Sequence, residues 1–394
     1  MQTSQAKTLQ EKTIIVSVTS DLCTDQRVHR TAITLHLQQY HVIVVGRKLP
    51  TSFDIKQPYV TKRFKLWFTS GALFYITYQL RLFWFLLFTK ADLLFANDLD
   101  TLLPNYLVSK LKNIPIVFDS HEYYTGVPEL ENRPFIKNIW KSVERFIVPR
   151  LAYTITVNES IANLFYDEYK NKFAIVRNIP LQPPVIKVTD IDLFKKENNI
   201  PADKFVIILQ GNGINVHRGA EELVAAMEQV QNAVLIIAGN GDVIELLMQM
   251  VSGFKLHDKV IFKPRMQYDM LMQYTQIANL GISFDKPTNI NYLYSLPNKL
   301  FDYLHAHTPI LASNLPELKK IIEQYNIGYI LLNIEANEIA NTLNKIINDT
   351  ELLKQKKNNT YIAAEQLTWE HEKIALVQMV NNALRINQNG GANK

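Results

Sequence analysis

Short runs of apolar, often β-branched residues alternate along the chain with longer segments whose apolar positions recur every three or four residues. In the first half this pattern predicts strands and helices in turn, which is typical of βαβ units and a parallel sheet. The predicted strands are 13–18, 42–45, 91–96, 114–118, 154–157 and 173–176, and the predicted helices include 27–39 and 103–111.

The alternation stops at 181–202, a proline-containing and then polar stretch that we interpret as an inter-domain linker. A second series follows, with strands predicted at 205–209, 234–238, 259–262, 280–284, 309–312 and 328–332. Helices are predicted at 219–230, 242–252, 267–277, 297–307, 316–324, 335–347, 350–367 and 370–386. We therefore predict two α/β domains, 13–180 and 203–369, with disordered tails at 1–12 and 387–394. Ligands of such parallel sheets bind at the carboxyl ends of the strands.

Composition narrows the class of protein. A chain of 394 residues with 47% hydrophobic content is long enough for two cores. The single cysteine, Cys23, excludes an intramolecular disulfide and a multi-cysteine zinc site, and it fits a reducing cytoplasm. The polar start of the chain predicts no signal peptide.

Charge is divided unevenly between the halves. Residues 1–182 contain 22 Lys and Arg against 15 Asp and Glu, whereas residues 183–394 contain 20 against 22. The first half, at +7, is therefore the better candidate to meet an anionic partner, although a solvated basic surface explains the same number.

The segment 62–90 is rich in aromatic residues and flanked by Lys and Arg. Gln79 and Arg81 interrupt its apolar run, which argues against a transmembrane helix. Two interpretations stay open: a helix lying in the membrane interface, anchored by Trp67, Phe68 and Trp84, or a helix buried in the first domain.

Glycines gather in one part of the second half. Gly211, Gly213, Arg218 and Gly219 lie between a predicted strand and a helix, and Gly241 follows the next strand. Bare backbone and a basic side chain there favour diphosphate binding, while a tight turn between strand and helix is the alternative. Neither a GxGxxG nor a GxxxxGK[ST] motif is present.

A second polar segment opens the predicted helix 297–307. Ser295 is expected to cap this helix, Lys299 lies in its first turn, and Asn298 and Asp302 share one helical face. A carboxylate at Asp302 could accept both hydroxyls of a ribose, but Lys299 and Asp302 could equally form a surface ion pair.

These segments resemble the donor domain of GT-B glycosyltransferases of the retaining family 4, or group 1, type. The resemblance rests on Arg218-Gly219, on the Gly-x-Gly ending at Gly241, and on Asp302 with the following small residues and Pro309. Tyr294 occupies the place of the first of two acids in that family's motif. The resemblance implies an α/β fold of two Rossmann-like parallel-sheet domains facing a cleft, with the last helix, 370–386, crossing back to the first domain.

The resemblance also implies roles for individual residues. Asp302 would hold the ribose, Arg218 and Lys299 the diphosphate, and main chain near Arg265 and Met266 the base. Catalysis is then expected to depend on His121, Asp302, Arg218 and Lys299. The whole donor set is Gly211, Gly213, Arg218, Gly219, Gly241, Arg265, Met266, Ser295, Asn298, Lys299 and Asp302.

Polar residues also follow the strands of the first half. His121 and Glu122 come directly after a predicted strand, where the family places a histidine that contacts the donor sugar; a purely structural histidine is the alternative. Asn158, Asp21 and Asp25 are further acceptor-side candidates, and Asn158 and Asp25 could instead cap helices.

Asp98 and Asp100 form an Asp-x-Asp sequence at a strand end. In GT-A glycosyltransferases this sequence holds a divalent metal, but here it lies in the half without phosphate loops. We therefore predict no metal, and leave Asp98 as an acceptor-side residue or a helix cap.

The expected function is metal-independent transfer of a sugar, with retention, from a nucleotide-diphosphate donor of the UDP or GDP type to a glycan or lipid-linked acceptor. No cofactor is expected, and surface-polysaccharide or lipopolysaccharide synthesis in the cytoplasm, at the inner membrane face, is the expected setting. A non-catalytic nucleotide-sugar-binding scaffold and a GT-B epimerase remain alternatives. The chain lacks a recognisable pyridoxal-phosphate lysine, a dehydrogenase GxGxxG after its first strand and a nucleic-acid-binding motif.

Overall fold

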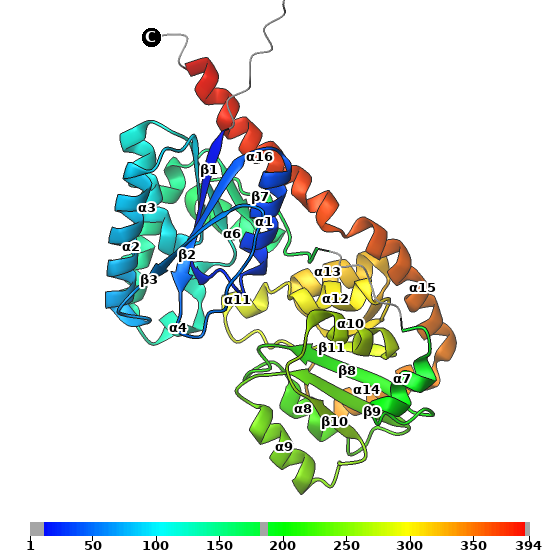
Figure 1. Cartoon of the computed structure of the whole chain (residues 1–394). Coiled ribbons are helices and arrows are strands. Elements are labelled where there is room, and N and C mark those ends of the chain that lie inside the picture. The colour runs from blue at the N-terminus through cyan, green and yellow to red at the C-terminus, as the bar shows by residue number, and fades with distance from the viewer. Residues whose placement is uncertain (1–11, 182–187, 391–394) are drawn as a thin grey trace, which may run out of the picture. The chain divides into compact units, whose positions relative to one another are not determined.

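The chain folds into two compact units (Figure 1). The computed structural model describes residues 12–181 and 188–390, so the predicted tails within 1–11 and 391–394 and the linker residues 182–187 lie outside it. One unit runs to Arg177 and takes up the chain again at Glu372, and the other comprises Asn178–His371.

A seven-stranded parallel sheet forms the centre of the first unit, in the order β3-β2-β1-β4-β5-β6-β7. Its central strands are buried on both faces because helices cover both sides, and this explains their continuous apolar runs. The strands are β1 Thr13–Asp21, β2 His41–Lys48, β3 Val60–Lys65, β4 Leu93–Asn97, β5 Ile116–Ser120, β6 Thr154–Thr156 and β7 Ala174–Ile175.

The helices of this unit connect successive parallel strands. They are α1 Gln26–Leu37, α2 Gly71–Phe88, α3 Leu99–Lys112, α4 Pro128–Glu131, α5 Pro134–Ile147 and α6 Glu159–Tyr169. The last helix of the chain, α16 Trp369–Gly390, also packs here: Glu372 binds Arg177, and Asn381 accepts a hydrogen bond from the Tyr40 hydroxyl.

The second unit contains a six-stranded parallel sheet of order β10-β9-β8-β11-β12-β13. Apolar clusters pack on both of its faces, one around Leu235 and Phe284 and the other around Ile236 and Tyr303. The strands are β8 Phe205–Gly211, β9 Ala233–Gly239, β10 Val260–Lys263, β11 Leu280–Ser283, β12 Ile310–Ser313 and β13 Gly328–Leu331. The helices are α7 Ile191–Glu197, α8 Ala220–Ala226, α9 Ile244–Gly253, α10 Tyr268–Ile277, α11 Ile290–Leu293, α12 Asn298–His305, α13 Pro316–Tyr325, α14 Ala336–Asn348 and α15 Thr350–Gln366.

The predicted pair of Rossmann-like parallel-sheet domains is confirmed, with three differences in detail. Strand β3 was not predicted, because Lys62, Arg63 and Lys65 make this edge strand polar. Helix α7 occupies part of the stretch interpreted as a linker, and its Phe194 packs on Tyr274. Helix α16 continues to Gly390, through residues that were expected to be disordered.

Candidate functional site

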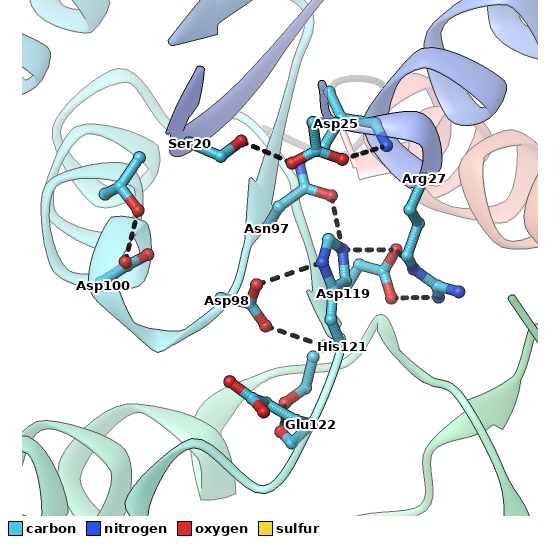
Figure 2. Close-up of polar contacts among 12 residues, drawn as sticks. Ser20, Asp25, Arg27, Asn97, Asp98, Asp100, Asp119, His121 and Glu122 are labelled. Atoms are coloured by element: carbon cyan, nitrogen blue, oxygen red, sulfur yellow. Dashed lines mark hydrogen bonds and ion pairs between the residues drawn. The ribbon is translucent and has the colours of Figure 1, made fainter. Parts of the chain in front are cut away.

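Strand ends of the first unit bring a histidine between two carboxylates, with further acidic side chains nearby (Figure 2). Parallel pairing sets Asn97 at the end of β4 opposite Asp119 in β5, so Asp98 and His121 follow at the same edge of the sheet. His121 donates from Nδ1 to Asp98 over 3.1 Å, and its Nε2 lies 3.2 Å from Asn97 Oδ1 and 3.5 Å from Asp119. His121 is therefore held by side chains from two neighbouring strand ends, and its contact with a donor sugar stays a prediction.

Neighbouring charges determine the protonation state of His121. Burial disfavours an imidazolium, but Asp98 and Asp119 outweigh it and raise the pKa of His121 to about 10. Burial likewise works against the Asp119 carboxylate, yet Arg27 and His121 hold its pKa at about 2. Arg27 contacts Asp119 with two nitrogens, at 2.7 and 3.1 Å, and both side chains are buried. His121 is thus a fixed cation at neutral pH.

Asp98 has an unusual backbone. Its φ of 58° and ψ of 165° lie in a region that non-glycine residues rarely occupy, and such strain concentrates at functional sites. Although Asp98 precedes α3, its side chain makes no capping hydrogen bond; one oxygen accepts from the His121 amide over 2.8 Å and the other binds the ring. The helix-cap interpretation of Asp98 is therefore wrong.

Two further carboxyl groups complete the cluster. Asp100 is 6% exposed; Oδ2 accepts a 2.5 Å hydrogen bond from Thr19, while Oδ1 is buried and has no partner among the residues described. Burial, reinforced by Asp98, raises the pKa of Asp100 to about 7, and the same two causes raise the pKa of Glu122 to about 7. These groups can change protonation near neutral pH.

Three other predicted residues of the first unit have structural roles. Asp25 caps α1 by accepting from the Val28 amide, and Asn158 caps α6 by accepting from the Ile161 amide. The Asp21 carboxylate binds Arg63 at 3.1 Å and accepts from the Ser52 hydroxyl. In each case packing and local hydrogen bonding account for the polar residue.

Glycines let two loops of the second unit approach closely. A Cβ on Gly239 would lie 1.8 Å from the Gly211 carbonyl oxygen, and one on Gly241 would lie 2.0 Å from that of Ile214. The loops are joined by backbone hydrogen bonds between Asn240 and both Gly211 and Ile214. This fixes the polypeptide before Arg218, whereas Gly213 has open space around its Cα.

Arg218, Lys299 and Asp285 form the charged centre of the second unit. Arg218 donates to Asp285 over 2.9 Å, stacks over the Tyr292 ring, and buries an Nε that has no partner among the described residues. Burial lowers the pKa of Lys299, Asp285 opposes that change and Arg218 adds to it, so the three groups interact. Arg218 pairs with Asp285, and Lys299 lies close enough for its charge to interact with both, so this centre contains two basic side chains for one carboxylate, a balance that suits an anionic ligand.

The beginning of α12 differs from the prediction. Ser295 does not cap the helix; its hydroxyl donates to Asp285 over 3.3 Å, and Pro297 occupies the cap position. Asn298 and Lys299 lie in the first turn. No ion pair joins Lys299 to Asp302 in the part of the chain that the structure describes.

Asp302 is 8% exposed, and both of its carboxylate oxygens already accept hydrogen bonds. Tyr268 donates to Oδ1 over 2.7 Å and Gln210 to Oδ2 over 3.0 Å. A ribose contact at Asp302 stays a prediction. Arg265 is exposed after β10, and Met266 packs partly into the core.

No group of three or more His, Cys, Asp or Glu side chains within 12–181 and 188–390 is arranged to hold a metal ion. The cluster of the first unit contains enough carboxylates, but its oxygens face His121, Arg27 and Thr19 instead of one common point.

Two family models match the chain in succession. Residues 25–180 match Glycosyltransferase Family 4, and residues 190–363 match Glycosyl transferases group 1. The protein is a GT-B glycosyltransferase. A comparison with curated protein sequences gives no match.

Solved structures share the fold of this glycosyltransferase. Sucrose-phosphate synthase from Thermosynechococcus elongatus matches with a TM-score of 0.76 and 17% identity, over 95% of this chain and 100% of that one. Anabaena HepE in complex with UDP gives 0.71 and 14%, over 94% and 100%. WaaG, a glycosyltransferase involved in lipopolysaccharide biosynthesis, gives 0.67 and 13%, over 92% and 99%.

Sequence reasoning missed several residues that the glycosyltransferase brings into its two centres. Asp285 directly follows the predicted strand 280–284, so its strand-end position was a usable signal. Arg27 lies 92 residues before Asp119, and no local sequence pattern indicates that the two form an ion pair. Gln210 and Tyr268 likewise reach Asp302 only through the folded sheet.

Proposed function

We propose that this glycosyltransferase moves a sugar from a nucleotide-diphosphate donor to a hydroxyl group of a glycan or lipid-linked acceptor, with retention of configuration and without a metal or other cofactor. The observation that carries the proposal is the Arg218–Asp285 ion pair together with Lys299, whose charge interacts with both groups, so that two basic side chains stand against one carboxylate. A diphosphate leaving group needs such positive charge in the transition state.

Similar structures support the choice of donor. HepE from Anabaena has been solved with UDP, with UDP and glucose, and with UDP-glucose, and a TarM variant from S. aureus with UDP. We therefore favour a UDP-sugar over a GDP-sugar. The likeness to WaaG supports surface-polysaccharide or lipopolysaccharide synthesis, in the cytoplasm, as the setting.

The proposed reaction needs little proton chemistry from the protein. The bond between the anomeric carbon and the phosphate oxygen breaks as Arg218 and Lys299 stabilise the developing negative charge. The acceptor oxygen bonds to the anomeric carbon from the same face, and its proton passes to the departing phosphate oxygen. To contact the donor sugar, His121 would exchange one of its present ring partners, Asp98 or Asn97, for a sugar hydroxyl, and Asp302 would accept from the ribose.

Calorimetric titration of UDP, GDP, ADP and CMP, each with EDTA, tests the donor site. The expected result is tight metal-free binding of UDP that falls at least about 100-fold in Arg218→Ala, because charge-assisted contacts are lost. Asp302→Ala should also weaken binding, whereas Lys354→Ala, an exposed lysine of α15, should not. Binding of no nucleotide, or binding only with Mg²⁺ or Mn²⁺, would contradict the assignment.

Turnover separates an enzyme from a binding scaffold. NMR of the product formed from an α-linked UDP-sugar, with acceptor or with water, should show an α-linked product that is absent with Asp302→Ala. A β-linked product would overturn retention alone. Nucleotide binding without any turnover would instead favour the scaffold.

A further inference from the structure

Helix α2 is apolar on two opposite sides. One side faces the first unit and buries Phe74, Tyr78, Leu82 and Leu86. The opposite side, which we call the outer stripe, repeats at intervals of three or four residues and is therefore a single helical face. The outer stripe consists of Leu73, Ile76, Leu80, Trp84 and Phe88, each more than half exposed.

The outer stripe continues into neighbouring apolar surface. Trp67, in the segment before α2, is 99% exposed, and Phe68 beside it is also exposed. Helix α3 packs along α2 and exposes Leu107 and Leu111, one turn apart. Large connected apolar patches are rare on the surfaces of soluble monomers and typically mark interaction sites, so we expect this surface to bind a partner.

The charge around the outer stripe has one sign. From residue 55 to residue 91 the sequence contains six Lys and Arg and no Asp or Glu. Lys65, Arg81 and Lys90 are exposed, as is Lys110 on α3, while the single acid of α3, Asp100, is buried. An anionic partner therefore complements this surface.

The way α2 is held argues against a membrane crossing. By length and composition it is the one helix among the described residues that could span a bilayer. However, Tyr78 and Leu82 are fully buried, and the Tyr78 hydroxyl donates to the carbonyl of Val18 in β1. Inserting α2 across a membrane would expose the sheet it covers, so only its outer side is available to lipid.

We propose that the outer stripe, with Trp67 and Phe68, docks the protein on the surface of a membrane that contains anionic lipid. Both sequence-based interpretations of 62–90 then hold, each for one side of the helix. A second copy of the chain fits less well, because a symmetric contact would set basic residues against basic residues. The proposal does not depend on the donor site, since membrane binding and sugar transfer are measured separately.

Co-sedimentation of the full chain with vesicles tests the proposal. The wild type should bind phosphatidylcholine vesicles that contain phosphatidylglycerol, and bind pure phosphatidylcholine more weakly. Leu80→Glu with Trp84→Glu should reduce binding at least about 100-fold, because apolar burial is lost and charge is added. Lys65→Gln with Lys90→Gln should reduce it about tenfold on anionic vesicles only.

Matched controls separate docking from folding. Ile362→Glu places one such charge on an equally exposed apolar site of α15, and should leave vesicle binding unchanged, whereas Leu80→Glu alone should weaken it. Trp67→Ser lies outside any helix, so it should weaken binding with the urea-unfolding curve unchanged. Acrylamide quenching gives a second readout: vesicles should protect Trp67 and Trp84, whereas Trp140 and Trp369 are buried already.

Two outcomes would overturn the proposal. One is equal binding of the wild type and the outer-stripe variants. The other is absence of vesicle binding together with a dimer, in vesicle-free solution, that the outer-stripe variants dissociate; the surface would then join two copies of the chain.

Discussion

The two units share a topology and differ in the chemistry at their strand ends. Both place their first strand between the second and the fourth, so both present loops at the carboxyl edge of a parallel sheet. In the first unit that edge carries four acidic residues, two of which contact one histidine, whereas in the second it carries two basic side chains and one carboxylate that pairs with Arg218. Topology therefore sets where a ligand is bound, and the side chains set which ligand it is.

The ion pairs of the two charged centres also differ in how deeply their side chains are buried. The Arg27–Asp119 pair leaves only 4% and 2% of its side chains exposed, while Arg218 keeps 25% exposed beside a fully buried Asp285. A buried pair is a fixed structural element, but a partly open arginine can exchange water for a ligand. This exposure supports the proposal that the second unit binds the anionic donor.

The largest expected effect concerns the buried pair. Asp119→Asn should destabilise the protein by about 3–5 kcal/mol in urea unfolding, because it leaves the Arg27 guanidinium buried without a counter-charge. Asp285→Asn in the second unit should cost clearly less, since water can reach Arg218. Equal losses of unfolding free energy in Asp119→Asn and Asp285→Asn would show that solvent exposure does not decide how much each ion pair stabilises the protein.

A somewhat smaller effect on stability is expected at Asp100, and it should depend on pH. The pKa of Asp100 is raised to about 7, so the unfolded chain loses this proton first as pH rises, and the folded state loses stability between about pH 4 and pH 7. Asp100→Asn should therefore stabilise the protein more at about pH 8 than at about pH 5, by up to about 3 kcal/mol.

Thermal unfolding at the two pH values measures this difference. Asp54→Asn changes an exposed carboxyl of the same unit and should give no such dependence. A pH-independent effect of Asp100→Asn would mean that this carboxyl is ionised in the folded protein.

The smallest expected effect, in free-energy terms, is on turnover. Lys299→Met should lower kcat/KM about 100-fold, equivalent to about 2.7 kcal/mol, because it removes one of two cations that stabilise the leaving diphosphate. Burial disfavours the charge of Lys299, so the same variant should unfold at equal or higher urea concentration.

Loss of turnover together with loss of stability in Lys299→Met would point to a structural lysine. Lys345→Met, on the exposed side of α14, is the matched control and should change neither quantity.

Much of the fold could be predicted because buried parallel strands are continuous apolar runs, as in β8 and β9. Strand β3 could not, since its alternating charges resemble a loop. At the sites, the positions of His121 after a strand and of Arg218 in the loop before a helix were predictable. Their partners were not: whether Asn158 caps a helix, or Asp119 binds Arg27, depends on contacts that form only in three dimensions.

Helix α16 affects the order in which the two units can complete their folding during synthesis. Its residues from Glu372 onward belong to the first unit, where Leu376, Val380 and Ala383 are buried. A ribosome synthesises the remaining residues of that unit first, and almost the whole second unit before this helix emerges. The N-terminal unit therefore completes its core only after the second unit has been synthesised, and until α16 emerges it exposes the apolar surface that this helix will cover.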